Sequence, residues 1–434
     1  MKTSHNASTF HEGPLPPEQI HPALRDVYVH SFEVLSQGLT AGDRYPEVWI
    51  RDLATFIEIQ SRVVPHDVLC EALLRFFAFQ QPDGAILDGF TAKGSSIDAY
   101  NLFTTPLQPD WVGHKNSVET DQESSLVIAV AHFIRATGQT GLLQEKVDGI
   151  SVLDRLGLAL DWVRLHRWSP AHGLVWNATT IDWGDGQAIR NWEETADGQP
   201  LTPERLPELT ELNEQSHPAL CVYTNALFSL ALTDYAWLCE QAGRDVAEVH
   251  QENNALRSAI RSVLWDKEHG KFRPHVYLDK GSPFPDDFNE NEIHYHGGTA
   301  VAMQAGLLTV EEMRRVVADM QANVAAAGAR TVGMTIWPLY HVPSLNNALF
   351  IKPFRYQNGG DWPWWGARIP QALCQHGLYE EAAATLLPIA GMIKDADGFY
   401  EWYAPDGTPH GAAGFRGAAG VFAKAAEMLG RHIA

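Results

Sequence analysis

Two carboxylates three residues apart are candidates for acid catalysis. Asp182 and Asp185 flank Trp183 and Gly184 in the stretch 179–186. A general acid needs a carboxyl group in a partly dry pocket, where its pKa rises toward neutrality. Asp182 has the more apolar neighbours and is the first candidate for this acid. Asp185, between two glycines, is interpreted as a substrate ligand or a turn residue, and the pattern leaves open which of the two is the acid.

A third carboxylate lies inside an aromatic cluster near the C-terminus. Glu401 stands among Phe399, Tyr400, Trp402 and Tyr403. Burying an unpaired carboxylate is costly, so this residue needs partners or a chemical role. A base that activates water is such a role, and an exposed Glu on a surface hairpin is the structural alternative. Trp402 is a candidate sugar-stacking ring.

Two further segments carry residue types that suit a sugar. Arg51 donates and Asp52 accepts hydrogen bonds, so the pair can clamp neighbouring hydroxyls, although an Asp also complements a helix dipole. The segment 354–365 combines amides and glycines with three tryptophans, and aromatic faces beside amides match the apolar face and hydroxyl rim of a sugar. The candidate ligands from both segments are Tyr45, Trp49, Arg51, Asp52, Tyr356, Gln357, Asp361 and Trp362.

Several loop residues allow a functional and a structural interpretation. Trp111 is a stacking platform or a plug, and Trp183 is a candidate wall of the site. The carboxylates of 119–121 are read as an ordinary acidic first helical turn. His296 is a candidate sugar ligand. It is near His294, but no third ligand follows with suitable spacing, so neither a metal nor a cofactor is predicted.

The elements that position these residues are helices. Helical periodicity dominates, with strand-like alternation rare, and about twelve helices are expected from their start and stop signals. They lie near 22–40, 50–64, 66–80, 118–137, 150–168, 217–242, 246–266, 295–306, 310–327, 362–376, 378–394 and 415–432.

The connections between these helices alternate in length. The links at 41–49, 81–117, 169–216, 267–294, 328–361 and 395–414 are the long ones. In a ring of antiparallel helix pairs, alternate links emerge on the same face, and long loops in a compact domain are usually functional. We therefore predict an all-α fold, an (α/α)6 barrel with one active-site face. A solenoid is disfavoured because no recurring repeat is visible.

Composition narrows the ligand classes. The chain has 434 residues, 45% of them hydrophobic, and a formal net charge of −21. This surface repels phosphate backbones and anionic membranes, so we expect neither nucleic acid nor a membrane as partner, and a small neutral glycoside instead. No apolar run is long enough for a membrane span, and the N-terminus lacks a signal-peptide core, which predicts a cytoplasmic protein.

Domain organisation is predicted to be simple. Residues 1–21 are expected to form an N-terminal extension and residues 22–434 a single catalytic domain. The four cysteines form no CxxC pair, so neither a disulfide framework nor a zinc site is indicated. The sequence does not indicate an oligomeric state.

Four segments resemble enzymes of one clan of inverting glycoside hydrolases. The stretch 354–364 closely resembles the Tyr-Gln-Asn-Gly-Gly-x-Trp-Pro-Trp signature of neutral/alkaline invertases, with a looser version in amylo-1,6-glucosidases. The stretch 401–411 is similar to the C-terminal segment of these enzymes, whose first residue is the general base. Residues 49–52 resemble the Trp-x-Arg-Asp of glucoamylases, where the Arg and Asp grip the sugar. Glucosylglycerate and mannosylglycerate hydrolases are a further similar group.

The resemblance implies an inverting exo-glycosidase. Asp182 aligns by position with the general acid and Glu401 with the general base. Asp361 stands where invertases usually have a small apolar residue, and Trp-Gly-Asp-Gly replaces their basic residues after the acid, which disfavours sucrose as the substrate. An α-linked gluco-configured sugar is the expected substrate.

Three other functions fit the same pattern. They are an inverting phosphorylase on the same barrel, a sugar epimerase that would use His294 and His296, and a non-catalytic carbohydrate-binding protein.

Overall fold

A computed structural model describes residues 14–95, 102–188, 206–341 and 352–433, so residues 1–13 of the expected N-terminal extension lie outside the described part. Every range predicted to be helical contains a helix. The helices are α1 (Arg25–Leu35), α2 (Ile50–Gln60), α3 (His66–Phe79), α4 (Gln122–Thr137), α5 (Val152–His166), α7 (Leu206–Thr210), α8 (Val222–Gln241), α9 (Ala247–Ala259), α10 (His296–Gln304), α11 (Val310–Ala327), α12 (Pro363–Gly366), α13 (Arg368–Gln375), α14 (Tyr379–Asp395) and α15 (Arg416–Ile433).

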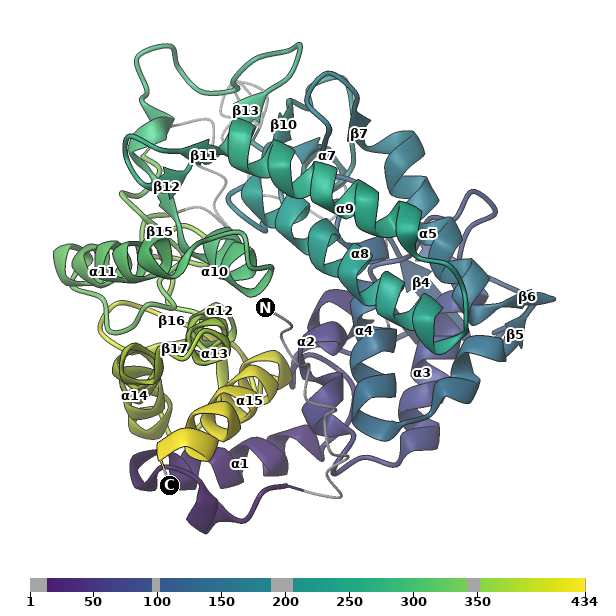
Figure 1. The fold of residues 1–434 in the computed structure, drawn as a ribbon, viewed down its shortest axis with the longest axis horizontal. Helices are drawn as coiled ribbons and strands as arrows, with labels where there is room; N and C mark the ends of the chain where they lie inside the picture. The colour runs from purple at the N-terminus through teal and green to yellow at the C-terminus, as the bar shows by residue number, and fades with distance from the viewer. Residues whose placement is uncertain (1–13, 96–101, 189–205, 342–351, 434) are drawn as a thin grey trace.

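Six of these helices form a closed inner ring. Around the ring, α2 packs on α4, α4 on α8, α8 on α10, α10 on α13, α13 on α15, and α15 on α2 again. The helices α1, α3, α5, α9, α11 and α14 lie outside this ring (Figure 1). The inner helices are apolar on most of their circumference, as α4 and α8 illustrate, because they are covered on two sides. The predicted (α/α)6 barrel is confirmed.

Some helix boundaries differ from the prediction for local reasons. The helix expected from 217 begins at Val222, because residues 218–220 pair in a sheet instead. The helix expected at 362–376 is divided into α12 and α13. Pro370 then falls in the first turn of α13, where its missing N–H costs no intrahelical hydrogen bond.

The links carry short strands that the helical periodicity did not reveal. They are β1 (Val48–Trp49), β2 (Gly89–Ala92), β3 (Leu102–Phe103), β4 (Trp111–His114), β5 (Lys146–Val147), β6 (Ile150–Ser151), β7 (Trp168–Ser169), β8 (Leu174–Val175), β9 (Asn177–Ala178), β10 (Pro218–Leu220), β11 (Trp265–Asp266), β12 (Lys271–Phe272), β13 (Val276–Tyr277), β14 (His294–Tyr295), β15 (Ile336–Trp337), β16 (Tyr400–Tyr403) and β17 (Pro409–Ala413).

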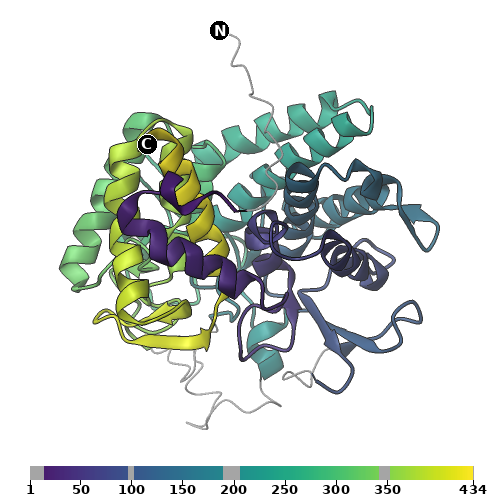
Figure 2. The same ribbon diagram turned by 90° about the horizontal axis from the view of Figure 1, so that it is seen from below.

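The six long links are joined to one another in a ring. Strand pairs join the first link to the second (β1–β2), the third to the fourth (β10–β13) and the fourth to the fifth (β14–β15). Backbone contacts complete the ring: Ser117 N to Thr210 O (2.9 Å), Asp361 paired with Tyr403, and Asp43 N to Ala413 O (3.0 Å). Figure 2 shows the yellow-green C-terminal hairpin and the blue β2–β4 region toward the same end of the barrel. All six links therefore surround one mouth, as predicted.

No helix in the described part of the chain is long and apolar enough to cross a membrane. Described residues of the expected N-terminal extension pack on the barrel: the Leu15 amide donates to the Tyr28 hydroxyl (2.8 Å).

Candidate active site

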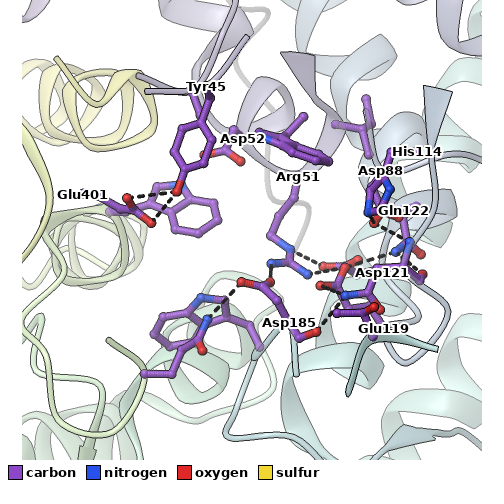
Figure 3. Close-up of a pocket in the computed structure, with 18 of the residues that line it drawn as sticks. Tyr45, Arg51, Asp52, Asp88, His114, Glu119, Asp121, Gln122, Asp185 and Glu401 are labelled. Carbon is purple, nitrogen blue, oxygen red and sulfur yellow. Dashed lines mark hydrogen bonds and ion pairs between the residues drawn. The ribbon is translucent and has the colours of Figure 1, made fainter. Parts of the chain in front are cut away.

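A cavity of about 290 Å³ opens at the loop end of the barrel. This volume is at the lower end of the range for small-molecule sites. Figure 3 shows the polar groups that converge on it from several links. It is lined by Ala41, Tyr45, Trp49, Ile50, Arg51, Asp52, Asp88, His114, Asn116, Glu119, Asp121, Gln122, Trp183, Asp185, Thr210, Tyr356, Gln357, Trp362, Trp364, Glu401 and Phe415.

Arg51 organises one wall of the cavity. Its guanidinium contacts three carboxylates, those of Asp121 (Nε–Oδ2 2.5 Å), Glu119 (2.6 Å) and Asp185 (2.7 Å) (Figure 3). The first turn of α2 projects Arg51 into the mouth because the first link pairs with the second through β1 and β2. The Tyr223 hydroxyl also donates to Asp121 (2.7 Å). This network fixes Asp185 at the cavity edge.

The two aspartates of the 179–186 stretch point in different directions. Asp185 lines the cavity and accepts from Arg51 and from the Tyr356 hydroxyl (3.0 Å). Asp182 is almost fully buried and does not line the cavity, and its carboxylate accepts from the Gly298 amide (2.9 Å) at the start of α10. A helix N-terminus stabilises a carboxylate in this way. The first candidate for the acid is thus placed away from the cavity, and the alternative, Asp185, faces it.

Local geometry explains this divergence. Asp182 adopts a left-handed backbone conformation (φ 53°), and the Gly184 amide donates to the Ile181 carbonyl (2.9 Å), which closes a tight turn. A Cβ atom on Gly298 would lie 2.7 Å from the Asp182 carboxylate, so the helix start must be glycine to approach so closely. The turn directs Asp182 toward α10 and releases Asp185 toward the cavity.

Glu401 is held on the opposite side of the cavity by β16. The Tyr45 hydroxyl lies 3.0 Å from each of its carboxyl oxygens, and the Ala412 amide donates to Oε2 (3.0 Å). The Tyr356 hydroxyl, which donates to Asp185, also helps to lower the pKa of Glu401. Glu401 is buried, yet it lines the cavity, so it is not a solvated hairpin residue.

The pKa values of these acids are perturbed in different directions. Burial, reinforced by the charge of Asp185, raises the pKa of Glu401 to about 7. Burial likewise raises the pKa of Glu119 well above its usual range. Burial also opposes ionisation of Asp185, but Arg51 and side-chain hydrogen bonds, including one with Glu119, outweigh it and lower its pKa. A hydrogen bond between two carboxyl groups requires a proton, and the raised pKa of Glu119 makes Glu119 the group of this pair that favours holding one.

The sugar-binding candidates Arg51, Asp52 and Gln357 line the cavity. Burial raises the pKa of Asp52 to about 8. Within the described residues, the Asp52 Oδ1 atom has no hydrogen-bond partner although it is buried. Such an atom is normally satisfied, so a ligand hydroxyl is a suitable partner.

Aromatic side chains complete the cavity. Trp49, Trp183, Tyr356 and Trp362 line it together with Tyr45. Trp362 packs edge-to-face against Trp183 (ring centroids 5.8 Å) and against Tyr356 (5.0 Å). The tryptophan-rich segment therefore forms part of the barrel core and part of the cavity wall at once.

Four predicted ligands do not line this cavity. Trp111 packs against Arg75, whose guanidinium carbon lies 3.7 Å from the ring centroid, so the plug interpretation describes it better. Trp402 stacks on His410 (4.4 Å), which keeps its ring from the cavity.

The other two are His296 and Asp361. His296 is buried in the first turn of α10 and contacts Asn323 (3.1 Å). Asp361 accepts from the Thr331 amide (2.8 Å) and hydroxyl, and its backbone pairs with Tyr403. Asp361 therefore supports the strand that carries Glu401. Invertases usually have a small apolar residue at this position, and the carboxylate of Asp361 bonds to Thr331 inside the protein.

Other polar lining residues were not singled out as ligands from the sequence, chiefly Asp88, His114, Asn116, Glu119, Asp121 and Gln122. Asp121 is the N-cap residue of α4 and Glu119 lies two residues before it, but the Asp121 side chain makes no capping hydrogen bond and contacts Arg51 instead. The interpretation of these acids as an ordinary first turn is therefore wrong. Their position directly after a long link was the signal that could have identified them.

The chain matches one family model over most of its length. The model of the mannosylglycerate hydrolase MGH1-like glycoside hydrolase domain matches residues 45–416. A search of the curated proteins finds no match.

Several solved structures have a similar fold. A GH63 mannosylglycerate hydrolase from Thermus thermophilus, in complex with glucose, is 17% identical with a TM-score of 0.62, over 91% of this chain and 99% of that one. The same hydrolase with Tris and D-glycerate is 18% identical (TM-score 0.58, 92% and 99% covered). A rhamnosidase from Klebsiella oxytoca with rhamnose bound is 17% identical (TM-score 0.58, 93% and 63% covered).

Proposed function

The chain belongs to the MGH1-like glycoside hydrolase family, and from this premise we propose that it is an inverting, exo-acting hydrolase of a small neutral α-glucoside. One observation carries the catalytic assignment. Carboxyl groups from two separate links, Asp185 and Glu401, face the same cavity, where the Tyr356 hydroxyl donates to Asp185 and the Tyr45 hydroxyl lies 3.0 Å from each carboxyl oxygen of Glu401. A glycosidase needs two carboxyl groups that flank the scissile bond.

Asp185, rather than Asp182, is our proposed general acid. In the reaction, the bond between the anomeric carbon and the glycosidic oxygen breaks, and the aglycone oxygen takes the electron pair and a proton from Asp185. Glu119 shares a proton with Asp185 and lies against the same guanidinium, so it can keep the acid supplied. The lowered pKa of Asp185 on its own would leave it ionised at neutral pH, which makes this partner necessary.

Glu401 is the proposed general base. It removes a proton from a water molecule whose oxygen attacks the anomeric carbon from the face opposite the aglycone. A pKa of about 7 suits a base that works near neutral pH. Tyr45 and the Ala412 amide hold both carboxyl oxygens in place, so the carboxylate is oriented before substrate arrives.

The terminal sugar would rest against the other cavity residues. Arg51 and Asp52 offer one donor and one free acceptor to neighbouring hydroxyls. Trp49 and Trp183 provide apolar walls, and Gln357 and Trp362 form the floor. This combination supports a neutral hexose. His294 and His296, the candidates for an epimerase, do not line this cavity.

The test is hydrolysis of a panel of α-glucosides with the first product anomer read by NMR. The panel contains sucrose, isomaltose, kojibiose, trehalose and glucosylglycerate, the last because the similar solved hydrolase acts on mannosylglycerate. We expect the β-anomer of glucose to appear first. Release of the α-anomer would overturn the inverting mechanism, and release of glucose from none of these compounds would overturn the substrate assignment.

A further inference from the structure

The cavity wall carries a large excess of acidic groups. Six carboxyl groups line it, and its described residues include one arginine, one histidine and no lysine. The acids are Asp52, Asp88, Glu119, Asp121, Asp185 and Glu401. The single guanidinium of Arg51 is already in contact with three of them, so it has little positive charge to offer a ligand.

The cavity wall also carries buried hydrogen-bond acceptors that have no donor. Among the described residues, four buried acceptor atoms on the wall have no partner: Asp52 Oδ1, Asp88 Oδ1, Asp121 Oδ1 and Gln122 Oε1. Asp88 does accept on its other oxygen from the Asn116 amide (2.6 Å). Buried acceptors without partners favour a ligand that donates hydrogen bonds. Hydroxyl and ammonium groups donate, whereas an ionised carboxylate only accepts.

On the proposed function, part of this acidic wall adjoins the aglycone. If Asp185 protonates the glycosidic oxygen, the first atoms of the aglycone lie within a few ångströms of Asp185, Glu119 and Arg51. At about 5 Å and an effective dielectric constant of about 20, one unpaired unit charge changes an affinity on the order of a hundredfold. Aglycone charge should therefore be felt strongly at this site.

We infer that the cavity selects glycosides by the charge of the aglycone, in the order ammonium-bearing, then uncharged, then carboxylate-bearing. This inference rests on the proposed glycosidase function of the same cavity. It separates the chain from the solved structure that holds D-glycerate, an anionic compound. The preferred substrate class is a glycoside of an amino alcohol or a polyol, and glycosides of hydroxy acids are rejected.

A matched set of three α-glucosides tests the order. Their aglycones are 3-amino-1,2-propanediol, glycerol and glycerate, which have similar size and differ chiefly in charge. We expect kcat/KM at neutral pH to fall at least about tenfold from glycerol to glycerate and to rise from glycerol to the amino alcohol. A glycerate glycoside that equals or exceeds the glycerol glycoside, or an amino alcohol glycoside that falls below it, overturns the inference.

Two variants test whether the acids of this wall cause the selection by aglycone charge. Asp121→Asn leaves the guanidinium of Arg51 with one counter-charge fewer, so the ratio of kcat/KM for glycerate over glycerol should rise about fivefold or more. Asp88→Asn, assayed at pH 9 where burial no longer keeps the Asp88 carboxyl protonated, removes a second wall charge and should move the ratio the same way, which keeps the test open if the first variant folds poorly. Glu248→Gln with Glu268→Gln, both exposed and absent from the cavity wall, is the matched control and should leave the ratio unchanged.

The outcomes separate the inference from the proposed function. If the control pair changes the ratio as much as the wall variants do, the net charge of the whole protein is responsible and the inference fails. If none of the three glycosides is hydrolysed, isothermal titration of the unsubstituted protein with each intact glycoside still measures the order of affinities. The expected order of affinities then upholds the charge selection while the hydrolytic assignment fails.

Discussion

The hydroxyl oxygen of Tyr45 lies 3.0 Å from both carboxyl oxygens of Glu401, although the two residues are 356 positions apart in the chain. The first and sixth long links meet at this point, because the Asp43 amide donates to the Ala413 carbonyl. Tyr45 therefore orients the carboxyl group of the proposed base at the point where the first and sixth links are joined.

Tyr45→Phe should move the acidic limb of the pH profile. The Tyr45 hydrogen bond lowers the pKa of Glu401, so its loss raises that pKa above about 7 and leaves less of the base ionised at neutral pH. We expect kcat/KM at neutral pH to fall roughly tenfold and the acidic limb to move to higher pH. Tyr235→Phe, whose ring does not line the cavity, is the control. An equal loss at every pH would mean that Tyr45 is only structural.

Asp185→Asn and Asp182→Asn form a matched pair that identifies the acid. The first should reduce kcat by about 10²–10⁴ while binding of the sugar persists. The second should instead lower stability by about 1–3 kcal/mol, because a buried amide group cannot accept from the Gly298 amide through both atoms as the carboxylate does. Steady-state kinetics and thermal unfolding measure the two effects. If Asp182→Asn abolishes turnover at unchanged stability and Asp185→Asn does not, Asp182 is the acid.

Glu119→Gln should move the basic limb of the pH profile of kcat/KM. Without the Glu119 proton, Asp185 beside Arg51 loses its acidic form at lower pH, so the basic limb should shift down by about one unit or more. Glucosides with a leaving group that needs no proton, such as dinitrophenolate, should be affected much less. Glu119→Asp is expected to restore part of the profile. A uniform loss for both substrate types would contradict the proton-sharing role.

Stability should decline as pH rises from about 6.5 to 8. Asp52 and Asp88 have folded-state pKa values of about 8, against 3.8 for the unfolded chain, mainly because of burial. Through these two groups the folded state binds up to two more protons than the unfolded chain, and they alone lower the stability by up to about 2.7 kcal/mol per pH unit. Below this window, half-buried His294 and buried His296, with lowered pKa values of about 4 and 3, oppose the trend.

Thermal unfolding midpoints across this pH window measure the effect. Asp52→Asn should remove up to about 1.4 kcal/mol per pH unit of the slope. A midpoint that rises steadily through the same window would contradict the assignment of these protons to the cavity acids.

The helix pattern of this protein was readable from sequence because it depends on local periodicity. Each predicted range contains a helix, and the alternation of long and short links predicted a single mouth. Glu401 could also be singled out, because a charge inside an aromatic cluster conflicts with burial unless it has partners. These features depend on neighbours within a few residues, and such information is present in the linear chain.

Only the tertiary structure decided which carboxylates share the cavity. Asp182 and Asp185 are three residues apart with similar chemistry, and their directions depend on the Gly298 amide, 116 residues from Asp182, and on Arg51, 134 residues from Asp185. The acids of 119–121 were predicted to form an ordinary first helical turn, but in the structure they contact the guanidinium of Arg51. Long-range contacts set the direction and the pKa of each acid, and local sequence carries no record of which distant group will be its partner.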